Sequence, residues 1–132
     1  MEWRVRAIRG ATTVSENSVE AIREAVTELL DELEKNNHLD PNDIISAIFS
    51  ATRDLDAVFP AAIARRRRGW DNVALLDVQH MYVPGDLDLC IRFLIHVNLP
   101  YPNAKIYHPY LRKAQNLRPD WSFPSTASTL SL

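Results

Sequence analysis

One segment repeats apolar side chains at the spacing of an α-helix, which limits the folds open to this chain. Its apolar stripe consists of Val19, Ile22, Val26, Leu29, Leu30 and Leu33. Acidic side chains occupy the opposite face, so the stripe must be buried against another element. Asn17, with Glu20 three residues later, predicts the helix N-cap, and Asn36-Asn37 predicts its end.

Segments on both sides of this helix have the patterns of β-strands. A period of two or a short apolar run predicts strands at residues 3–9, 43–51, 72–78, 87–97 and 105–110. Residues 10–13 are expected to form a turn, and residues 60–68 a second helix that begins at Pro60. This order predicts an α+β fold, in which a mixed sheet carries helices on one face.

The 132 residues are enough for one domain with a real core. We expect the domain to span residues 1–121 and a flexible tail to span 122–132, since the sequence from Pro119 onward is rich in serine, threonine and proline. A net charge of −2 gives no reason to expect nucleic acid, and no apolar run is long enough for a membrane. Cys90 is the single cysteine, which favours a reducing, cytoplasmic location.

Four arginines stand within apolar sequence: Arg9, Arg65, Arg92 and Arg118. A guanidinium in such surroundings usually has an anionic partner, and it binds carboxylates through two parallel hydrogen bonds. No nucleophile or metal cluster is equally clear, so the set predicts a site for a small di-anion without covalent chemistry. Residues 66–68 continue the basic run and are interpreted as a solvated helix end.

Two polar segments leave their roles open. Asp77-Val78-Gln79-His80 could bind a metal or transfer protons, but no other histidines or cysteines cluster with it, so an exposed strand end is the simpler interpretation. Tyr107-His108-Pro109-Tyr110 could hold a proton-transfer pair, although a tyrosine at a strand end is more often a packing residue with a wet hydroxyl. No metal or cofactor is therefore expected.

Several motifs together resemble the AroH-class chorismate mutases. In chain order, between residues 3 and 121, they are Arg6-Ala-Ile-Arg9-Gly-Ala-Thr-Thr-Val14, Ser50-Ala-Thr, Ala57-Val-Phe-Pro-Ala61, Gly69-Trp70, Val83-Pro-Gly85, Cys90-Ile-Arg92 and Leu117-Arg-Pro-Asp120. The resemblance implies a homotrimer that forms a pseudo-α/β-barrel, with active sites between subunits. It also implies rearrangement of chorismate to prephenate, in phenylalanine and tyrosine synthesis, without a cofactor.

The same resemblance implies roles for single residues. Arg92 matches the residue that contacts the ether oxygen of chorismate, Arg9 and Tyr110 match residues that hold the carboxylate near it, and Arg65 matches a second carboxylate contact. The pocket positions are Phe59, Ala61, Leu75, Leu76 and Leu117. Arg118 has no role in this comparison and is expected to pair with Asp120.

The chain departs from the family pattern at two positions. His80 stands where the family usually has a glutamate that pairs with the catalytic arginine, and Ala62 stands where a lysine is common. We hypothesise that Asp77 supplies the missing carboxylate and lies close to Arg92. Because positions 77 and 80 of a regular strand face opposite sides, this hypothesis requires a strand end or a bulge.

Two alternative functions remain open from the sequence. Imine or enamine deaminases of the RidA type share a similar trimeric architecture and also bind a carboxylate through arginine, so the fold does not decide between them. The set of Arg9, Arg65, Arg92 and Tyr110 suits two carboxylates and an ether better than one carboxylate. The changes at positions 62 and 80 also allow a non-catalytic trimer that binds an aromatic acid.

Overall fold

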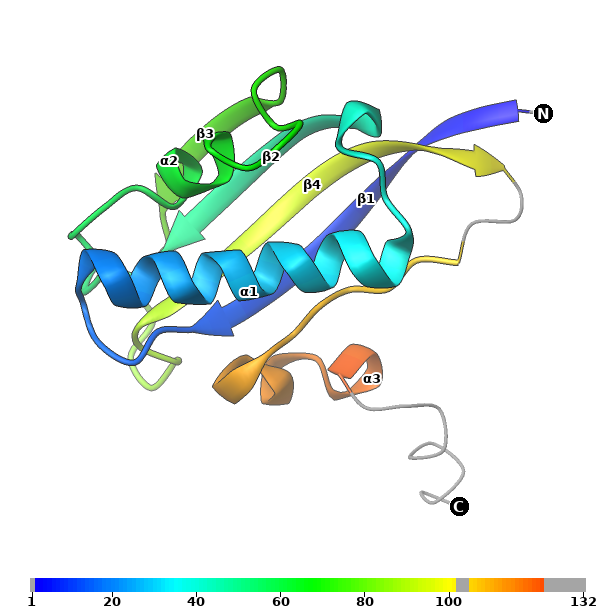
Figure 1. Cartoon of the computed structure of the whole chain (residues 1–132). Coiled ribbons are helices and arrows are strands. Elements are labelled where there is room, and N and C mark those ends of the chain that lie inside the picture. Colours follow the sequence, from blue (N-terminus) through cyan, green and yellow to red (C-terminus); the bar gives the residue numbers. More distant parts are fainter. Residues whose placement is uncertain (1, 102–104, 123–132) are drawn as a thin grey trace, which may run out of the picture.

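The computed structural model describes residues 2–101 and 105–122 (Figure 1). Its central element is a mixed β-sheet. Its elements are β1 (Glu2–Thr13), α1 (Val19–Asn37), η1 (Pro41–Asp43), β2 (Ile44–Ala51), α2 (Pro60–Arg65), β3 (Ala74–Gln79), β4 (Cys90–Tyr101), η2 (Arg112–Leu117) and α3 (Pro119–Ser122). In this part of the chain the strand order is β1-β4-β2-β3. Strand β4 is antiparallel to β1 and β2, whereas β2 and β3 are parallel. The predicted mixed sheet in an α+β fold is confirmed.

Helices α1 and α2 lie over the same face of this sheet (Figure 1). The apolar stripe of α1 is buried there, as its helical spacing predicts: Ile22, Val26, Leu29, Leu30 and Leu33 each have at most 1% exposure. They share one core with the inward side chains of the strands, among them Ile8, Phe49, Ile91 and Ile95. Burying each side chain of this size contributes roughly 1.5–3 kcal/mol, so packing on the sheet holds α1 in place.

Helix α1 ends at Asn37, as predicted, but its N-cap differs from the prediction by one residue. Ser18, and not Asn17, is the N-cap: its Oγ accepts a 3.1 Å hydrogen bond from Ala21 N–H. The Asn17 side chain instead accepts from the backbone N–H groups of Asp56 and Ala57, both at 3.1 Å, so it ties the loop before α2 to the start of α1. Both residues are good caps, and only the tertiary contact with the loop distinguishes them.

Strand β1 is longer than the sequence pattern predicts. The turn expected at residues 10–13 does not exist, because β1 stays paired with β4 from Glu2↔Tyr101 to Thr13↔Cys90. Gly10 sits inside the strand where a Cβ would lie 2.5 Å from Phe93 Cζ and 2.8 Å from Pro109 O. The glycine is thus required for close packing on both sides of the strand, which is a common reason for glycine within a sheet.

The remaining boundaries shift by a few residues. Helix α2 ends at Arg65, three residues before its predicted end, and β3 begins and ends later than predicted. Strand β4 begins at Cys90 instead of Leu87, because the chain before it turns with Leu89 at φ 47°. Strand β2 agrees with the prediction to within one residue and lies between β4 and β3, as its apolar sequence indicates.

The C-terminal segment docks on the outer edge of β1 without forming the predicted fifth strand. It makes one isolated parallel bridge, in which Ala11 N–H donates to Pro109 O and Leu111 N–H donates to Ala11 O, both at 2.9 Å. Pro109 has no N–H and cannot extend a ladder. Residues 119–122 form α3, so Ser122, the first residue of the predicted tail, belongs to a helix. The rest of that predicted tail, residues 123–132, lies outside the described residues.

The second sheet face, which we call the open face, points away from α1. Alternation along the paired strands places Arg9, Ser50 and Arg92 on it. Exposed apolar side chains share this face: Trp3 (53%), Val5 (58%), Leu76 (55%), Val78 (43%) and Leu94 (36%). In the described part of the chain, no helix is both long and apolar enough to cross a membrane.

Candidate active site

Two of the predicted site arginines, Arg9 and Arg92, meet on the open face. In the β1–β4 ladder, Arg92 pairs with Ala11 and Arg9 pairs with Leu94, so the two guanidinium groups project from neighbouring strands on the same side. They line an open hollow of about 210 Å³ together with Gly10, Ile48, Ser50, Phe93 and Leu94. Two fixed cations above an apolar strand surface form a suitable base for an anionic ligand.

The phenol of Tyr110 lies near these two arginines. It is 3% exposed and packs with Ala11 and Ala114, while Leu117 lies partly buried against the same cluster. Burial raises the pKa of the Tyr110 phenol, and the nearby charges of Arg9, Arg118 and Arg92 oppose that effect. The phenol therefore remains protonated near neutral pH and can donate a hydrogen bond beside the arginines.

Arg92 has one donor without a partner. Its Nη2 lies 3.1 Å from Asp86 Oδ2, and its side chain is only 22% exposed. Within the described residues, Arg92 Nε is the one buried side-chain nitrogen or oxygen that lacks a hydrogen-bond partner. A buried donor left unpaired costs about 1–3 kcal/mol, so it is suited to receive an acceptor that the protein itself does not supply.

The C-terminal segment adds Trp121, which sequence reasoning did not single out, beside His108 and Arg118. His108 Nδ1 accepts a 3.0 Å hydrogen bond from Arg9 N–H, and its ring stacks on Trp121 at 3.7 Å between centroids. The Arg118 guanidinium also lies over the Trp121 ring, with its Cζ 3.5 Å from the ring centroid. Arg118 pairs with Asp120 at 2.8 Å, as predicted. Trp121 was not singled out: it is the last residue of the expected domain and directly precedes the predicted tail.

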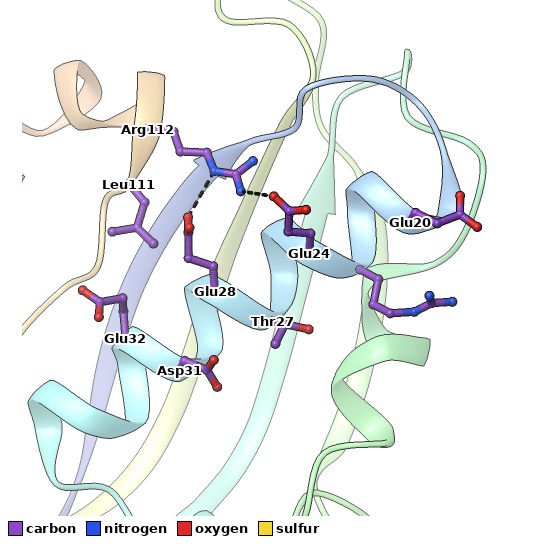
Figure 2. Close-up of a pocket in the computed structure, with 9 residues that line it drawn as sticks. Glu20, Glu24, Thr27, Glu28, Asp31, Glu32, Leu111 and Arg112 are labelled. Carbon is purple, nitrogen blue, oxygen red and sulfur yellow. Dashed lines mark hydrogen bonds and ion pairs between the residues drawn. The ribbon is translucent and has the colours of Figure 1, made fainter.

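Arg112 fastens this segment to the outer side of α1 (Figure 2). Its guanidinium lies 3.1 Å from Glu28 and 3.4 Å from Glu24, and it donates to Thr13 O at 3.1 Å. The hollow beside it is lined by five carboxylates, at Glu20, Glu24, Glu28, Asp31 and Glu32. That surface would repel an anion, so it does not compete with the arginines as a di-anion site.

The other predicted residues lie around α2 and β3, at the opposite edge of the sheet from β1. Arg65 is exposed at the end of α2, and Phe59, just before that helix, is 70% exposed. Ala61 is buried, and Leu75 points toward the helices, whereas Leu76 points to the open face. With β4 and β2 between β1 and β3, one chain does not bring this set to Arg9.

The hypothesis that Asp77 lies close to Arg92 is wrong within the chain. Asp77 is on the helix side of β3, where its Oδ1 accepts a 3.0 Å hydrogen bond from Ala61 N–H. Burial raises the pKa of Asp77, against the opposing effects of that hydrogen bond and of Arg65. The strand is regular at this position, so residues 77 and 80 face different sides, as the alternation rule requires.

His80 does reach the Arg92 cluster, through Asp86. Its backbone N–H donates to Ala51 O at 2.8 Å, which fixes it at the end of β3, and its Nε2 lies 3.4 Å from Asp86 Oδ2. The carboxylate partner of Arg92 is therefore in the turn before β4. Pro84-Gly85 in the sequence is typical of a turn, but nothing in it indicated that the Asp86 side chain would face Arg92.

The arginine run is only partly a solvated helix end. Arg66 and Arg68 are exposed, as expected. Arg67 is not, since its side chain is 17% exposed and lies 2.6 Å from Glu34 and 3.0 Å from Asp31. Glu34 also accepts a 3.0 Å hydrogen bond from Trp70 Nε1, so Arg67 joins α1 to the loop after α2.

Two other kinds of site, a metal centre and a reactive thiol, were considered in the described residues. No group of three or more histidine, cysteine or carboxylate side chains is close enough there to hold a metal. Cys90 is buried beside Arg92, and burial raises the pKa of its thiol, so it is a poor nucleophile.

Comparison with known proteins assigns the chain to a family. The family model described as chorismate mutase type I matches residues 5–121. The chain belongs to the type I chorismate mutase family. It is 42% identical to the chorismate mutase AroH of Bacillus subtilis (strain 168) over 118 residues, which cover 89% of this chain and 93% of that protein.

A second AroH chorismate mutase, from Thermus thermophilus, is 44% identical over 117 residues, or 88% of this chain and 95% of that protein. Among solved structures, a chorismate mutase from Clostridium thermocellum has a TM-score of 0.79 at 46% identity. That likeness covers 84% of this chain and 98% of the other. The α+β fold described above is thus the fold of a chorismate mutase.

Proposed function

We propose that this chain rearranges chorismate to prephenate at sites formed between neighbouring chains of a homotrimer. Family membership makes the chain an isomerase of the chorismate mutase class. In this rearrangement the ether C–O bond breaks while a C–C bond forms, and the protein exchanges no proton or covalent bond with the substrate. The residues therefore need only to bind, orient and stabilise charge.

The observation that carries the proposal is the buried, unpaired Nε of Arg92, in a hollow shared with Arg9 and within the electrostatic influence of Tyr110. Negative charge builds on the ether oxygen as its bond breaks, and a fixed cationic donor stabilises that charge more than it stabilises the substrate. Arg9 and the protonated Tyr110 provide neighbouring donors for a carboxylate. No metal or cofactor is required by this mechanism.

Separation of the predicted residues supports a shared site. The first set contains Arg9, Arg92, Tyr110 and Leu117, on β1, β4 and the C-terminal segment, together with His80, which reaches Asp86 from the end of β3. The second set, near α2 and β3, contains Phe59, Ala61, Arg65, Leu75, Leu76 and Asp77. A neighbour can bring its second set to the first set of this chain, and the exposed apolar side chains of the open face would then be buried between copies. Closure of three sheets in this way would form the pseudo-barrel.

The relatives favour rearrangement over deamination, because both AroH proteins at 42% and 44% identity are chorismate mutases. A chain that merely binds an aromatic acid would leave chorismate unchanged. We further propose a cytoplasmic location, which fits the buried free thiol of Cys90.

The decisive test follows the loss of chorismate absorbance with purified protein. Wild type should consume chorismate and form prephenate. Arg92→Ala should lower kcat by at least roughly 10²–10³, equivalent to about 3–4 kcal/mol of transition-state stabilisation. Arg92→Lys should recover only part of this, because a point charge replaces a planar group.

Arg23→Lys, on the outer side of α1, serves as the matched control and should keep wild-type rates. An Arg92→Ala protein with a normal kcat and only a raised KM would show that Arg92 binds substrate and transition state equally. Failure of wild type to consume chorismate would reject the activity itself.

A further inference from the structure

The turn between β3 and β4 supplies the carboxylate that holds Arg92. Asp86 Oδ2 lies 3.1 Å from Arg92 Nη2 and 3.4 Å from His80 Nε2. Its other oxygen, Oδ1, accepts a 2.8 Å hydrogen bond from Leu87 N–H. Arg92 Nη2 donates a hydrogen bond to Asp86 Oδ2. The two oxygens thus have separate tasks: one fixes the carboxylate to its own backbone, and the other faces the cation.

Local backbone geometry determines where this carboxylate lies. Asp86 is the fourth residue of a turn in which Pro84 precedes Gly85 at φ +88°, and Asp86 N–H donates to Val83 O at 3.1 Å. Proline followed by a residue at positive φ is the arrangement of a type II turn. The far end of the loop is held by a 3.0 Å hydrogen bond from Leu89 N–H to Asp54 Oδ2. The position of Asp86 is therefore fixed by backbone contacts that do not depend on Arg92.

We propose that Asp86 is the positioning residue that orients the Arg92 guanidinium for catalysis, an inference that rests on the proposed function. The ion pair occupies Nη2 and leaves Nε buried and unpaired. Restraining one end of a planar group also restrains the direction of its other donors. Nε is then aimed before substrate binds, so no reorganisation is needed when charge develops. Asp86 acts through Arg92 and does not itself need to touch the substrate.

Position 80 offers an internal check on this role. The His80 side chain reaches the same Asp86 oxygen that Arg92 contacts, so a longer carboxylate at position 80 would lie close to Arg92 Nη2. A glutamate at position 80 should therefore replace Asp86 from the end of β3. Asp77 cannot do so, because it lies on the helix side of the sheet and is bonded to Ala61.

The kinetic test compares Asp86→Asn with Asp88→Asn, which removes a carboxylate two residues away in the same loop. Asp86→Asn should lower kcat about tenfold or more with KM changed less than about threefold, because an uncharged amide holds Arg92 more weakly. Asp88→Asn should match wild type. The double variant Asp86→Asn with His80→Glu should regain most of the lost kcat. An unchanged or increased kcat in Asp86→Asn would overturn the proposal, and an increase would show that Asp86 obstructs the site.

A second readout needs no turnover. The ¹⁵Nε–¹Hε NMR signal of Arg92, assigned by its loss in Arg92→Lys, should shift or broaden in Asp86→Asn and return in the double variant. Asp88→Asn should leave it unchanged. An Arg92 signal that is identical in wild type and Asp86→Asn overturns the proposal whatever the rates are. If wild type fails to consume chorismate, the proposed function fails, while this signal still decides whether Asp86 orients Arg92.

Discussion

At the scale of single residues, the His108 imidazole connects the C-terminal segment to strand β1. His108 Nδ1 accepts from Arg9 N–H, which is possible only while that nitrogen carries no proton. The pKa of His108 is lowered from its ordinary value of 6.5, first by burial and then by the charges of Arg118, Arg9 and Arg6. The folded protein therefore favours the neutral ring, and the ring keeps Pro109 and Tyr110 beside β1.

This bond predicts a loss of stability in acid. As pH falls below 6.5, the unfolded chain takes up a proton on His108 before the folded chain does, so the free energy of unfolding decreases. His108→Asn retains an acceptor that does not titrate, so it should weaken this dependence by at most about 1.4 kcal/mol per pH unit. Urea unfolding between about pH 5 and 8 measures the effect. Parallel curves for wild type and His108→Asn would contradict the assignment.

At the scale of elements, the site depends on how the C-terminal segment is attached. A backbone bridge to Ala11 and the hydrogen bond from Arg9 N–H to His108 attach it to β1, and Gly10 permits the close approach. Arg112 provides a further attachment through Glu24, Glu28 and the carbonyl of Thr13 (Figure 2). Because Tyr110 lies two residues before Arg112, these contacts determine the position of a site residue as well as the stability of η2.

Arg112→Ala should therefore affect both stability and activity. Exposed ion pairs contribute little by themselves, but here a backbone carbonyl also loses its donor, so we expect a loss of about 1 kcal/mol in unfolding free energy. The value of kcat/KM should fall several-fold as Tyr110 becomes less well held. Lys113→Ala, the neighbouring change, should alter neither quantity. Chemical denaturation and the chorismate assay test this, and normal activity in Arg112→Ala would show that the segment's other contacts hold Tyr110 without Arg112.

At the scale of the whole molecule, the two sets of predicted site residues require each other. One surface provides Arg9, Arg92 and Tyr110, and the other provides Arg65 at the end of α2. A sheet that separates them within a chain, together with exposed apolar side chains on its open face, favours a closed assembly of identical chains. Light scattering should give about three times the 15.1 kDa chain mass, and a monomer at assay concentrations would contradict the proposal.

Mixing two inactive variants tests whether sites are shared. Arg92→Ala and Arg65→Ala proteins should each have low activity alone. After unfolding and joint refolding, each chain in a trimer is of either kind with probability one half, so about one quarter of the sites should combine two intact residues. Activity should therefore recover to about a quarter of wild type. No recovery, while the refolded wild type is active, would place both arginines in sites within one chain.

Local patterns in the sequence were sufficient to predict helix α1, strand β2 and the presence of a mixed sheet. Helix α1 has a complete apolar stripe, and β2 is apolar on both faces, so the hydrophobic effect alone selects their environment. The resemblance to the family supplied the arginines and Tyr110 as site residues. These features depend on residue type and spacing, which a single sequence contains.

The tertiary structure decided what depends on distant neighbours. β1 continues through residues 10–13 because β4 pairs with it, and residues 105–110 form only a bridge because Pro109 cannot extend the ladder. The partner of Arg92 is Asp86 instead of Asp77, because strand alternation turns Asp77 toward the helices while a turn brings Asp86 to the open face. Side-chain direction and loop placement depend on contacts between residues far apart in sequence, so only the folded chain determines which carboxylate meets the arginine.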